Sequence, residues 1–336
     1  DAGVLEITLL GQTVNHYRFE HDFMTEMNGV VQPQKGRTYK GSHHRDAMAG
    51  DRVTTFADLL YRIHEEAPGI QRLRFVTSYP RDFGNDVLEV MRDCPRICRY
   101  LHVPAQSGSD TVLKRMNRGY TVAEYDEFIC RAREHLDQPE IGRPLMLSGD
   151  IIVGFPGETD EDYEGTVRLL KRSRYKNCFI FKYSPRPGTV AYDRIPDDIP
   201  DAIKRTRNNH LLSVQAAISD EISREQLDRE FDVMVEGVSK RQLKDAGLTK
   251  GQIRKRDAVA LTIGGREPAT PPTTLASEAE PAVASHGETV QLSSRTDGDL
   301  IVFLDVPTAR ATELVGTIQR ARITSADERT LLGELI

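Results

Sequence analysis

Short apolar runs alternate with amphipathic segments along the first two thirds of the chain. A first strand is expected in "VLEITLL", with apolar residues at Val4, Ile7 and Leu9. Later runs, each ending in polar, Gly or Pro residues, predict strands in 70–80, 98–108, 145–157 and 177–188. Between them, apolar residues recur at the spacing of amphipathic helices in 55–67, 84–94, 121–136 and 160–173. This repeated strand–helix alternation predicts an α/β fold with parallel strands, in a barrel or a doubly wound sheet.

The pattern changes after Pro200. Residues 200–230 contain no glycine and no further proline, and their apolar side chains recur at helical spacing, at Leu211, Val214, Ile218 and Ile222. This spacing predicts one long amphipathic helix. Beyond it the apolar runs become short and β-like, which predicts a small all-β barrel. We therefore expect two domains, at 1–230 and 231–336.

Two segments interrupt these patterns. Residues 20–52 are rich in Gly, His and charged residues, and predict a long loop. Residues 264–288 are rich in Pro, Ala, Ser, Thr and Glu, a composition that buries too little apolar surface to fold. The second segment is therefore expected to be a disordered insert within the β-barrel.

Composition narrows the class of protein. No apolar run has the length needed to cross a bilayer, and the N-terminus lacks the pattern of a signal peptide. Four cysteines without a regular framework indicate a reducing compartment, so the cytoplasm is expected. A net charge of −6 argues against a protein that coats nucleic acid. Residues 239–256 nevertheless hold seven Lys/Arg against one Asp, which suits contact with one RNA substrate or a solvated loop.

The stretch "CPRIC" places Cys94 and Cys98 at a spacing that suggests metal binding. An iron–sulfur loop C-x-x-x-C-x-x-C would need a third cysteine where this chain has Leu101. Cys130 lies in an expected helix and Cys178 in an apolar run, where a free thiol usually behaves as a small hydrophobic group. We therefore expect the pair to be structural and assign no metal ligand.

The ends of the expected strands are polar. They carry Gln12 and Asn15, then Ser78 and Tyr79, then His102, Gln106, Ser107 and Asp110, then Ser148 and Asp150, and finally Tyr183, Ser184 and Arg186. Because the carboxyl ends of parallel strands meet at one edge, these residues predict a shared ligand cleft.

The turn "GFPGET", at 154–159, has two interpretations. Its glycines can let the backbone approach a ligand, or they can simply form a turn before the next helix. The sequence has no G-x-G-x-x-G, Walker A, H-E-x-x-H or G-x-S-x-G motif, so the usual dinucleotide, nucleotide, zinc-protease and hydrolase sites are excluded. No catalytic residue is identified by pattern alone.

Five motifs carry a resemblance to a known family: "LLGQTVNHY", "RFVTSYPRDF", "YLHVPAQSGSDTVLKRMNRGYT", "GDIIVGFPGETDEDYEGT" and "KYSPRPGTVAY". In this order they resemble the methylthiotransferases of the radical S-adenosylmethionine superfamily. The chain most resembles the branch that adds a methylthio group to isopentenylated adenosine in the tRNA anticodon loop. The segments "VMVEGVSKR", "SSRTDGDLIVF", "LVGTIQRARITSA" and "TLLGEL" resemble that family's TRAM domain, an RNA-binding β-barrel.

The resemblance implies a partial (β/α) barrel of the radical S-adenosylmethionine type that lacks its first strand, followed by the TRAM β-barrel. It also implies S-adenosylmethionine and two 4Fe–4S clusters as cofactors, an external electron donor, and tRNA rather than DNA as the partner. The cluster cysteines of the family are absent from this chain. We therefore expect them to lie upstream of Asp1 or to be lost, and the chain alone to be inactive.

Residue roles follow from the resemblance and from position at strand ends. Polar contacts with the amino-acid end and ribose of S-adenosylmethionine are assigned to Gln12, Asn15, Ser78, Gln106, Ser107 and Asp150. Ile152 is expected to pack on its adenine, and Arg186 to face its carboxylate or the substrate. RNA contacts are assigned to Lys240, Arg241 and Arg295.

Two alternatives stay open. The chain could belong to sister methylthiotransferases that act on threonylcarbamoyl-adenosine in tRNA or on an aspartate of a ribosomal protein. It could also be an RNA-binding remnant without catalysis, because the basic stretch suits both an enzyme and a binding module.

Overall fold

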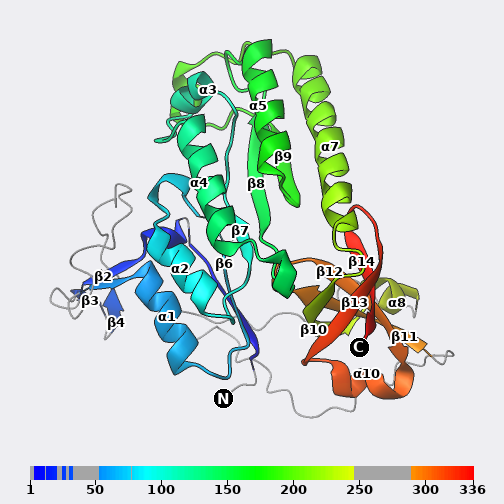
Figure 1. Ribbon diagram of the computed structural model, residues 1–336. Coiled ribbons are helices and arrows are strands. Elements are labelled where there is room, and N and C mark those ends of the chain that lie inside the picture. Colours follow the sequence, from blue (N-terminus) through cyan, green and yellow to red (C-terminus); the bar gives the residue numbers. More distant parts are fainter. Residues whose placement is uncertain are drawn as a thin grey trace.

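The computed structural model describes residues 4–11, 13–20, 25–27, 30–32, 53–76, 78–245 and 289–336. Its parallel strands are β1 (Glu6–Leu9), β6 (Arg72–Phe75), β7 (Tyr100–His102), β8 (Met146–Val153) and β9 (Asn177–Lys182). β1 pairs with β6, and β7, β8 and β9 pair in that order. Leu73 of β6 bridges Ile97, just before β7, which joins the two groups. The predicted α/β fold with parallel strands is confirmed (Figure 1).

Helices follow the strands and lie along them (Figure 1). They are α1 (Phe56–Glu66), α2 (Asn85–Asp93), α3 (Asp110–Arg115), α4 (Val122–Leu136), α5 (Asp160–Ser173), α6 (Val190–Arg194) and α7 (Asp201–Arg224). Short 3-10 turns occur at Val14–His16, Pro80–Asp82 and Pro139–Ile141.

Helices α1, α4 and α5 begin with the same reciprocal cap. A threonine side chain accepts from the backbone N–H three residues on, and the acidic side chain there accepts from the threonine N–H, in the pairs Thr55/Asp58, Thr121/Glu124 and Thr159/Asp162. Each cap satisfies N–H groups that the first helical turn leaves without partners. Residues only three positions apart in the sequence therefore determine where these helices start.

Strand β8 separates an apolar face from a polar one. Ile151 and Val153 are fully buried in the core. Gly149 lies between Leu147 and Ile151 on this face, where a Cβ would stand 3.0 Å from the Tyr175 ring. Ser148, Asp150 and Ile152 point to the opposite face, because side chains alternate along a strand. The opposite face, which carries Ser148, Asp150 and Ile152, is called the inner face below.

The C-terminal part forms a closed β-barrel, as predicted. Its strands are β10 (Glu230–Val238), β11 (Thr289–Thr296), β12 (Ile301–Pro307), β13 (Ile318–Ala326) and β14 (Thr330–Leu335), closed in the order β10-β11-β12-β14-β13. Two short helices accompany them, α8 (Lys240–Asp245) and α10 (Thr308–Leu314). Alternate residues such as Val290, Leu292, Val302 and Leu304 fill the interior.

Two buried arginines of β6 hold the β-barrel against the sheet. The Arg72 guanidinium donates to the carbonyls of Asp232 and Arg295, at 2.8 and 2.5 Å. Arg74 donates to the carbonyls of Thr296 and Asp297, at 2.9 and 3.1 Å. Arg74 also pairs with the Glu6 carboxylate at 3.1 Å. The turn between β11 and β12 is thereby fixed against the inner face.

The boundaries of two predicted segments differ from expectation. The helix expected over 200–230 ends at Arg224, because a turn follows in which Asp228 adopts a φ of 61° before β10 begins. The expected loop at 20–52 contains the hairpin β3 (Thr25–Met27) and β4 (Val30–Gln32). At its borders β2 (Arg18–Glu20) pairs with β5 (Val53–Thr55).

The remainder of 20–52 and the expected insert at 264–288 lie outside the described residues. Within the part of the chain that is described, no helix combines the length and apolar character needed to span a bilayer.

Lys176 lies where the sheet, α7 and the β-barrel meet. Its buried amine donates to the Ser223 hydroxyl at 2.7 Å and to the carbonyls of Ser219 and Glu328, at 3.2 and 2.8 Å. Burial lowers the pKa of this amine to about 8, against the opposing effect of Asp327, Glu328 and Asp220. The folded chain therefore releases this proton more readily than the unfolded chain.

We expect Arg74→Ala to lower the free energy of unfolding by about 3–5 kcal/mol, because it leaves Glu6 and two buried carbonyls without their donor. Urea unfolding followed by circular dichroism measures this loss. Arg310→Ala is the matched control, since Arg310 forms an exposed pair with Glu313 on α10. A loss below about 1 kcal/mol for Arg74→Ala would contradict the role of this residue at the junction.

Lys176 predicts a pH dependence of stability. Between about pH 8 and pH 10.5 the unfolded chain holds the Lys176 proton and the folded chain does not. The free energy of unfolding of the wild type, relative to Lys176→Met, should therefore rise with pH across this window. Urea unfolding of both proteins at pH 7.5, 9 and 10 tests this, and a difference that stays constant would refute it.

Candidate functional site

His102 and Asp150 form the centre of the inner face. The paired strands β7 and β8 place His102 opposite Ser148, whose hydroxyl lies 3.0 Å from Nδ1 of the imidazole. The other ring nitrogen, Nε2, lies 3.5 Å from the Asp150 carboxylate. The three side chains thus form one polar cluster between two neighbouring strands.

Gln106 extends this cluster beyond the end of β7. Its backbone N–H donates to the Asp150 carbonyl at 2.8 Å, and its carbonyl accepts from the Ile152 N–H at 2.9 Å. Gln106 has a φ of 67°, in the left-handed region, so the chain turns sharply there. Ser107 follows, buried, with its hydroxyl 3.4 Å from that of Thr166. The turn brings Gln106 beside Asp150 and Ile152.

Ser78 has a buried hydroxyl that no other described residue contacts through a hydrogen bond. Its backbone N–H donates to the His102 carbonyl at 3.2 Å, which places the residue at the carboxyl end of the same layer. Its Oγ is buried and has no hydrogen-bond partner among the described residues. Because buried hydroxyls are normally paired, this atom marks a position where a polar ligand group would fit.

Of three other residues predicted to contact S-adenosylmethionine, one makes structural hydrogen bonds, one is exposed and one lies outside the described residues. The Asn15 amide donates to the carbonyls of Tyr79 and Asp82, at 3.0 and 3.1 Å, and accepts from the Tyr79 N–H at 2.9 Å. Its hydrogen bonds thus hold the segment after β6. Arg186 is exposed in the loop after β9. Gln12 lies outside the described residues.

Of the predicted residues, Asp150 lies beside the His102 side chain, whereas Ser78 bonds to the His102 backbone and Gln106 to the Asp150 backbone. Sequence reasoning noted His102 and Ser148 at strand ends but gave them no role. The signal that could have found them is the pairing of a histidine on one strand with a serine and an aspartate on the same face of the next.

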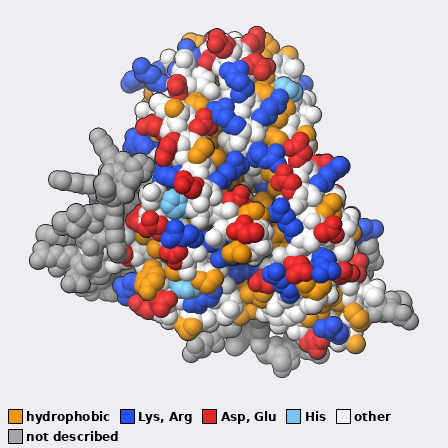
Figure 2. Space-filling view, viewed as in Figure 1, with side chains coloured by type: hydrophobic (Ala, Val, Ile, Leu, Met, Phe, Trp, Pro, Cys, Tyr) orange, Lys and Arg blue, Asp and Glu red, His pale blue; other side chains and the backbone are white. Residues whose placement is uncertain are grey.

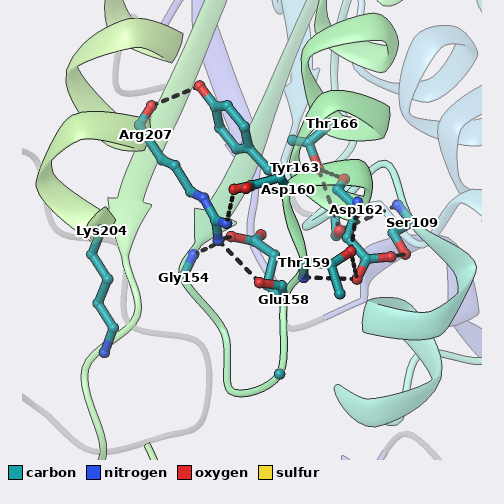
Figure 3. Close-up of polar contacts among 12 residues, drawn as sticks. Ser109, Gly154, Glu158, Thr159, Asp160, Asp162, Tyr163, Thr166, Lys204 and Arg207 are labelled. Carbon is teal, nitrogen blue, oxygen red and sulfur yellow. Dashed lines mark hydrogen bonds and ion pairs between the residues drawn. The ribbon is translucent and has the colours of Figure 1, made fainter. Parts of the chain in front are cut away.

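The turn at 154–159 is held by a buried ion pair (Figure 3). The buried Glu158 carboxylate accepts from the Gly154 N–H at 2.8 Å and from Arg207 of α7 at 2.6 Å. Arg207 also pairs with Asp160 at 2.7 Å. Burial raises the pKa of Glu158, opposed by Gly154 and Arg207. The turn that ends β8 is thus fixed to α7.

The structure favours the interpretation that Gly154 and Gly157 simply form a turn. Gly154 and Gly157 have φ values of 70° and 76°, which glycine adopts without strain. The N–H of Gly157 donates to Asp198 at 2.7 Å, so both glycine amides already have protein acceptors. Thr159 caps α5 (Figure 3).

The cysteines do not form a cluster site. Cys94 and Cys98 are buried, and burial raises the pKa of the Cys98 thiol to about 12 and also raises that of Cys94. A protonated thiol is a poor metal ligand. Across the described ranges, no group of three or more His, Cys, Asp or Glu residues could hold a metal ion.

The predicted RNA-binding residues divide into two kinds. Lys240 and Arg241 are exposed at the start of α8. Arg295 instead pairs with Glu236 and Asp299, at 2.9 and 3.1 Å, and its position is fixed by the β-barrel. On the face seen in Figure 2, basic and acidic side chains are interspersed.

Comparisons with known proteins agree on one family. Residues 35–170 match the model of the radical SAM superfamily. The chain is 45% identical over 241 residues to the tRNA-2-methylthio-N(6)-dimethylallyladenosine synthase of Rhodopirellula baltica, covering 72% of this chain and 43% of that protein. The Bacteroides fragilis protein of the same name is 33% identical over 332 residues, covering 99% of this chain and 54% of the relative.

Among solved structures, coproporphyrinogen III oxidase of Escherichia coli, a radical SAM enzyme, is 20% identical with a TM-score of 0.39, over 49% of this chain and 37% of that one. The chain spans about half the length of the curated relatives it matches. With a radical SAM match and relatives of one name along most of its length, the chain belongs to the radical SAM methylthiotransferase family.

Proposed function

We propose that this chain supplies the S-adenosylmethionine site and the RNA-binding barrel of a tRNA methylthiotransferase. The whole protein would add a methylthio group to an isopentenylated adenosine next to the anticodon, in the cytoplasm. The observation that carries the proposal is the polar cluster of His102, Ser148 and Asp150 on the inner face, with the unpaired Ser78 hydroxyl beside the same strand end. The names of the relatives supply the reaction.

The residues of the inner face fit S-adenosylmethionine. Asp150 presents a partly exposed carboxylate that suits an ammonium group or ribose hydroxyls. Ser78 offers a hydroxyl without a partner in the described part of the chain, and Ile152 offers an apolar side chain on the same face as Asp150. When bound, S-adenosylmethionine supplies the methyl group. The protein binds and orients it, with His102 beside the Asp150 carboxylate.

The two 4Fe–4S clusters of the family do not fit the described residues of this chain. Their thiolate ligands would have to converge, whereas Cys94 and Cys98 are buried as neutral thiols in the core. We therefore assign no reaction step to a cluster here, and none to the external electron donor that would serve it.

The β-barrel is the proposed contact with the tRNA anticodon stem-loop. Lys240 and Arg241 are exposed neighbours on α8, which packs beside β11. Exposed cations bind phosphates without reading sequence, so they would position the RNA. Because Arg72 and Arg74 fix the barrel to the sheet, RNA held on the barrel keeps a constant relation to the inner face.

We expect Asp150→Asn to weaken S-adenosylmethionine binding roughly tenfold or more, since a hydrogen bond to a charged group contributes about 1.5–3 kcal/mol. Isothermal titration calorimetry measures the dissociation constant. Asp126→Asn is the matched control, because Asp126 pairs with Arg172 between α4 and α5. A wild-type chain that binds tRNA but no S-adenosylmethionine would instead support the RNA-binding remnant.

We expect Lys240→Glu/Arg241→Glu to weaken tRNA binding and to make the remaining affinity less dependent on salt. Each lost phosphate contact should reduce the slope of log K against log salt by about 0.7–0.9. Fluorescence anisotropy at several potassium chloride concentrations measures both effects. Arg322→Glu serves as a control on the same barrel, since Arg322 pairs with Glu230. An unchanged affinity and slope would remove α8 from the RNA contact.

A further inference from the structure

Strand β9 exposes two large aromatic side chains on the inner face. Phe179 and Phe181 are 56% and 52% exposed, whereas Ile180 between them is buried on the opposite face. The pairing of β8 with β9 places Phe179 opposite Asp150 and Phe181 opposite Ile152. The two rings thus border the proposed S-adenosylmethionine site, and water contacts half of each.

The two rings are nearly parallel, and each is about half exposed to solvent. Their planes differ by 14° and their centroids are 6.5 Å apart. Alternate residues of a strand are separated by about 6.6 Å, so the backbone sets this spacing. Carbon atoms in contact lie about 3.5 Å apart, so two contacts in series span about 7 Å. The centroid separation of 6.5 Å is close to this span, so a small rotation of the two side chains would admit one planar ring into a slot between them.

Polar groups lie beside the slot. The His102 ring is 6.3 Å from the Phe179 ring at an angle of 66°, and His102 is the residue that approaches Asp150. A planar ligand between the phenyl rings would therefore meet hydrogen-bonding groups at its edge. Such a combination of aromatic faces with a polar edge is the usual way that proteins hold an unstacked base.

The outer edge of β9 is partly occupied by α7, which limits its pairing with an added peptide strand. The Ile180 carbonyl of β9 already accepts from the Asn208 side chain of α7 at 3.1 Å. An extended peptide would have to compete with this contact, whereas a planar ring would use only the phenyl faces. Directly after β9 the chain reaches the exposed Arg186, a cation placed to meet a phosphate.

We propose that Phe179 and Phe181 form a stacking slot for the unstacked adenine base of the RNA substrate, an inference that rests on the proposed function. S-adenosylmethionine also carries an adenine, but its apolar support is assigned to Ile152 on β8. The slot is on the outer strand and half open to solvent, which suits a base attached to a large RNA. Phe179 and Phe181 are then substrate-binding residues that position the base, because stacking itself does not distinguish one base from another.

The probe is an RNA anticodon stem-loop with 2-aminopurine, a fluorescent adenine analogue, at the target position. Its fluorescence falls when an aromatic ring stacks on it. For the wild-type chain we expect quenching on binding. Phe179→Ala/Phe181→Ala should abolish the quenching and weaken binding roughly five- to hundredfold, the range measured for base–aromatic stacking. Phe179→Tyr/Phe181→Tyr should restore both.

Three controls make the result specific. Tyr61→Ala removes a similarly exposed aromatic ring from α1 and should change neither signal. An RNA with 2-aminopurine in its stem should show no quenching. S-adenosylmethionine affinity, measured by calorimetry, should be the same in the double alanine variant, which also reports that the fold is intact.

The outcomes separate the two proposals. RNA binding with undiminished quenching in the double alanine variant overturns the slot and leaves the proposed function standing. Loss of S-adenosylmethionine binding with unchanged RNA quenching also overturns it, because the rings would then hold the cofactor adenine. A wild-type chain that binds no RNA overturns the proposed function, and the slot with it.

Discussion

The arrangement of this protein depends on two buried guanidinium groups, those of Arg72 and Arg74. Their side chains leave β6 on the same face because they stand two residues apart. Both donate to backbone carbonyls of the β-barrel, which satisfies charges that would otherwise be costly to bury. A barrel whose own strands are closed is thereby attached to a sheet with which it shares no strand pairing among the described residues.

This attachment divides the inner face of the sheet into two regions. The turn between β11 and β12 lies against the start of β8, where a Cβ added to Gly298 would stand 2.8 Å from the Met146 side chain. The residues nearer the end of β8, Asp150 and Ile152, remain partly exposed. The barrel therefore occupies the amino-terminal part of the face and leaves the carboxyl-terminal part for a ligand.

Helix α7 connects the turn after β8 with the region where the sheet meets the β-barrel. Near its start Arg207 holds the turn after β8 through Glu158, and near its end Ser219 and Ser223 accept from Lys176. Figure 1 shows α7 running beside β9 toward the β-barrel. Because a helix is stiff, the end of β8 and the barrel are held in a fixed relation at two separate places. RNA bound to the barrel and a ligand bound at β8 would share that fixed geometry.

The sequence by itself determined the features that depend on neighbours along the chain. Strand–helix alternation predicted the parallel layer, the spacing of apolar residues predicted the helices that became α1, α2, α4 and α5, and short β-like runs predicted the closed barrel. Polar residues at strand ends located the candidate site in general, because parallel strands must end at one edge. The motifs placed the chain in its family, since they span most of the fold.

Tertiary structure alone decided which polar side chains can contact a ligand and which are already bonded within the protein. Arg295 is assigned to RNA contact from the sequence, but it is held in ion pairs within the fold, and Arg72 and Arg74 likewise donate to carbonyls of the β-barrel. Asn15 has the residue type of a ligand contact, yet its amide is occupied by the backbone of Tyr79 and Asp82. The register of β7, β8 and β9 brought His102 beside Asp150 and placed Phe179 opposite Asp150. Such pairings join residues far apart in the chain, and no local pattern encodes them, because register is fixed by packing of the whole sheet.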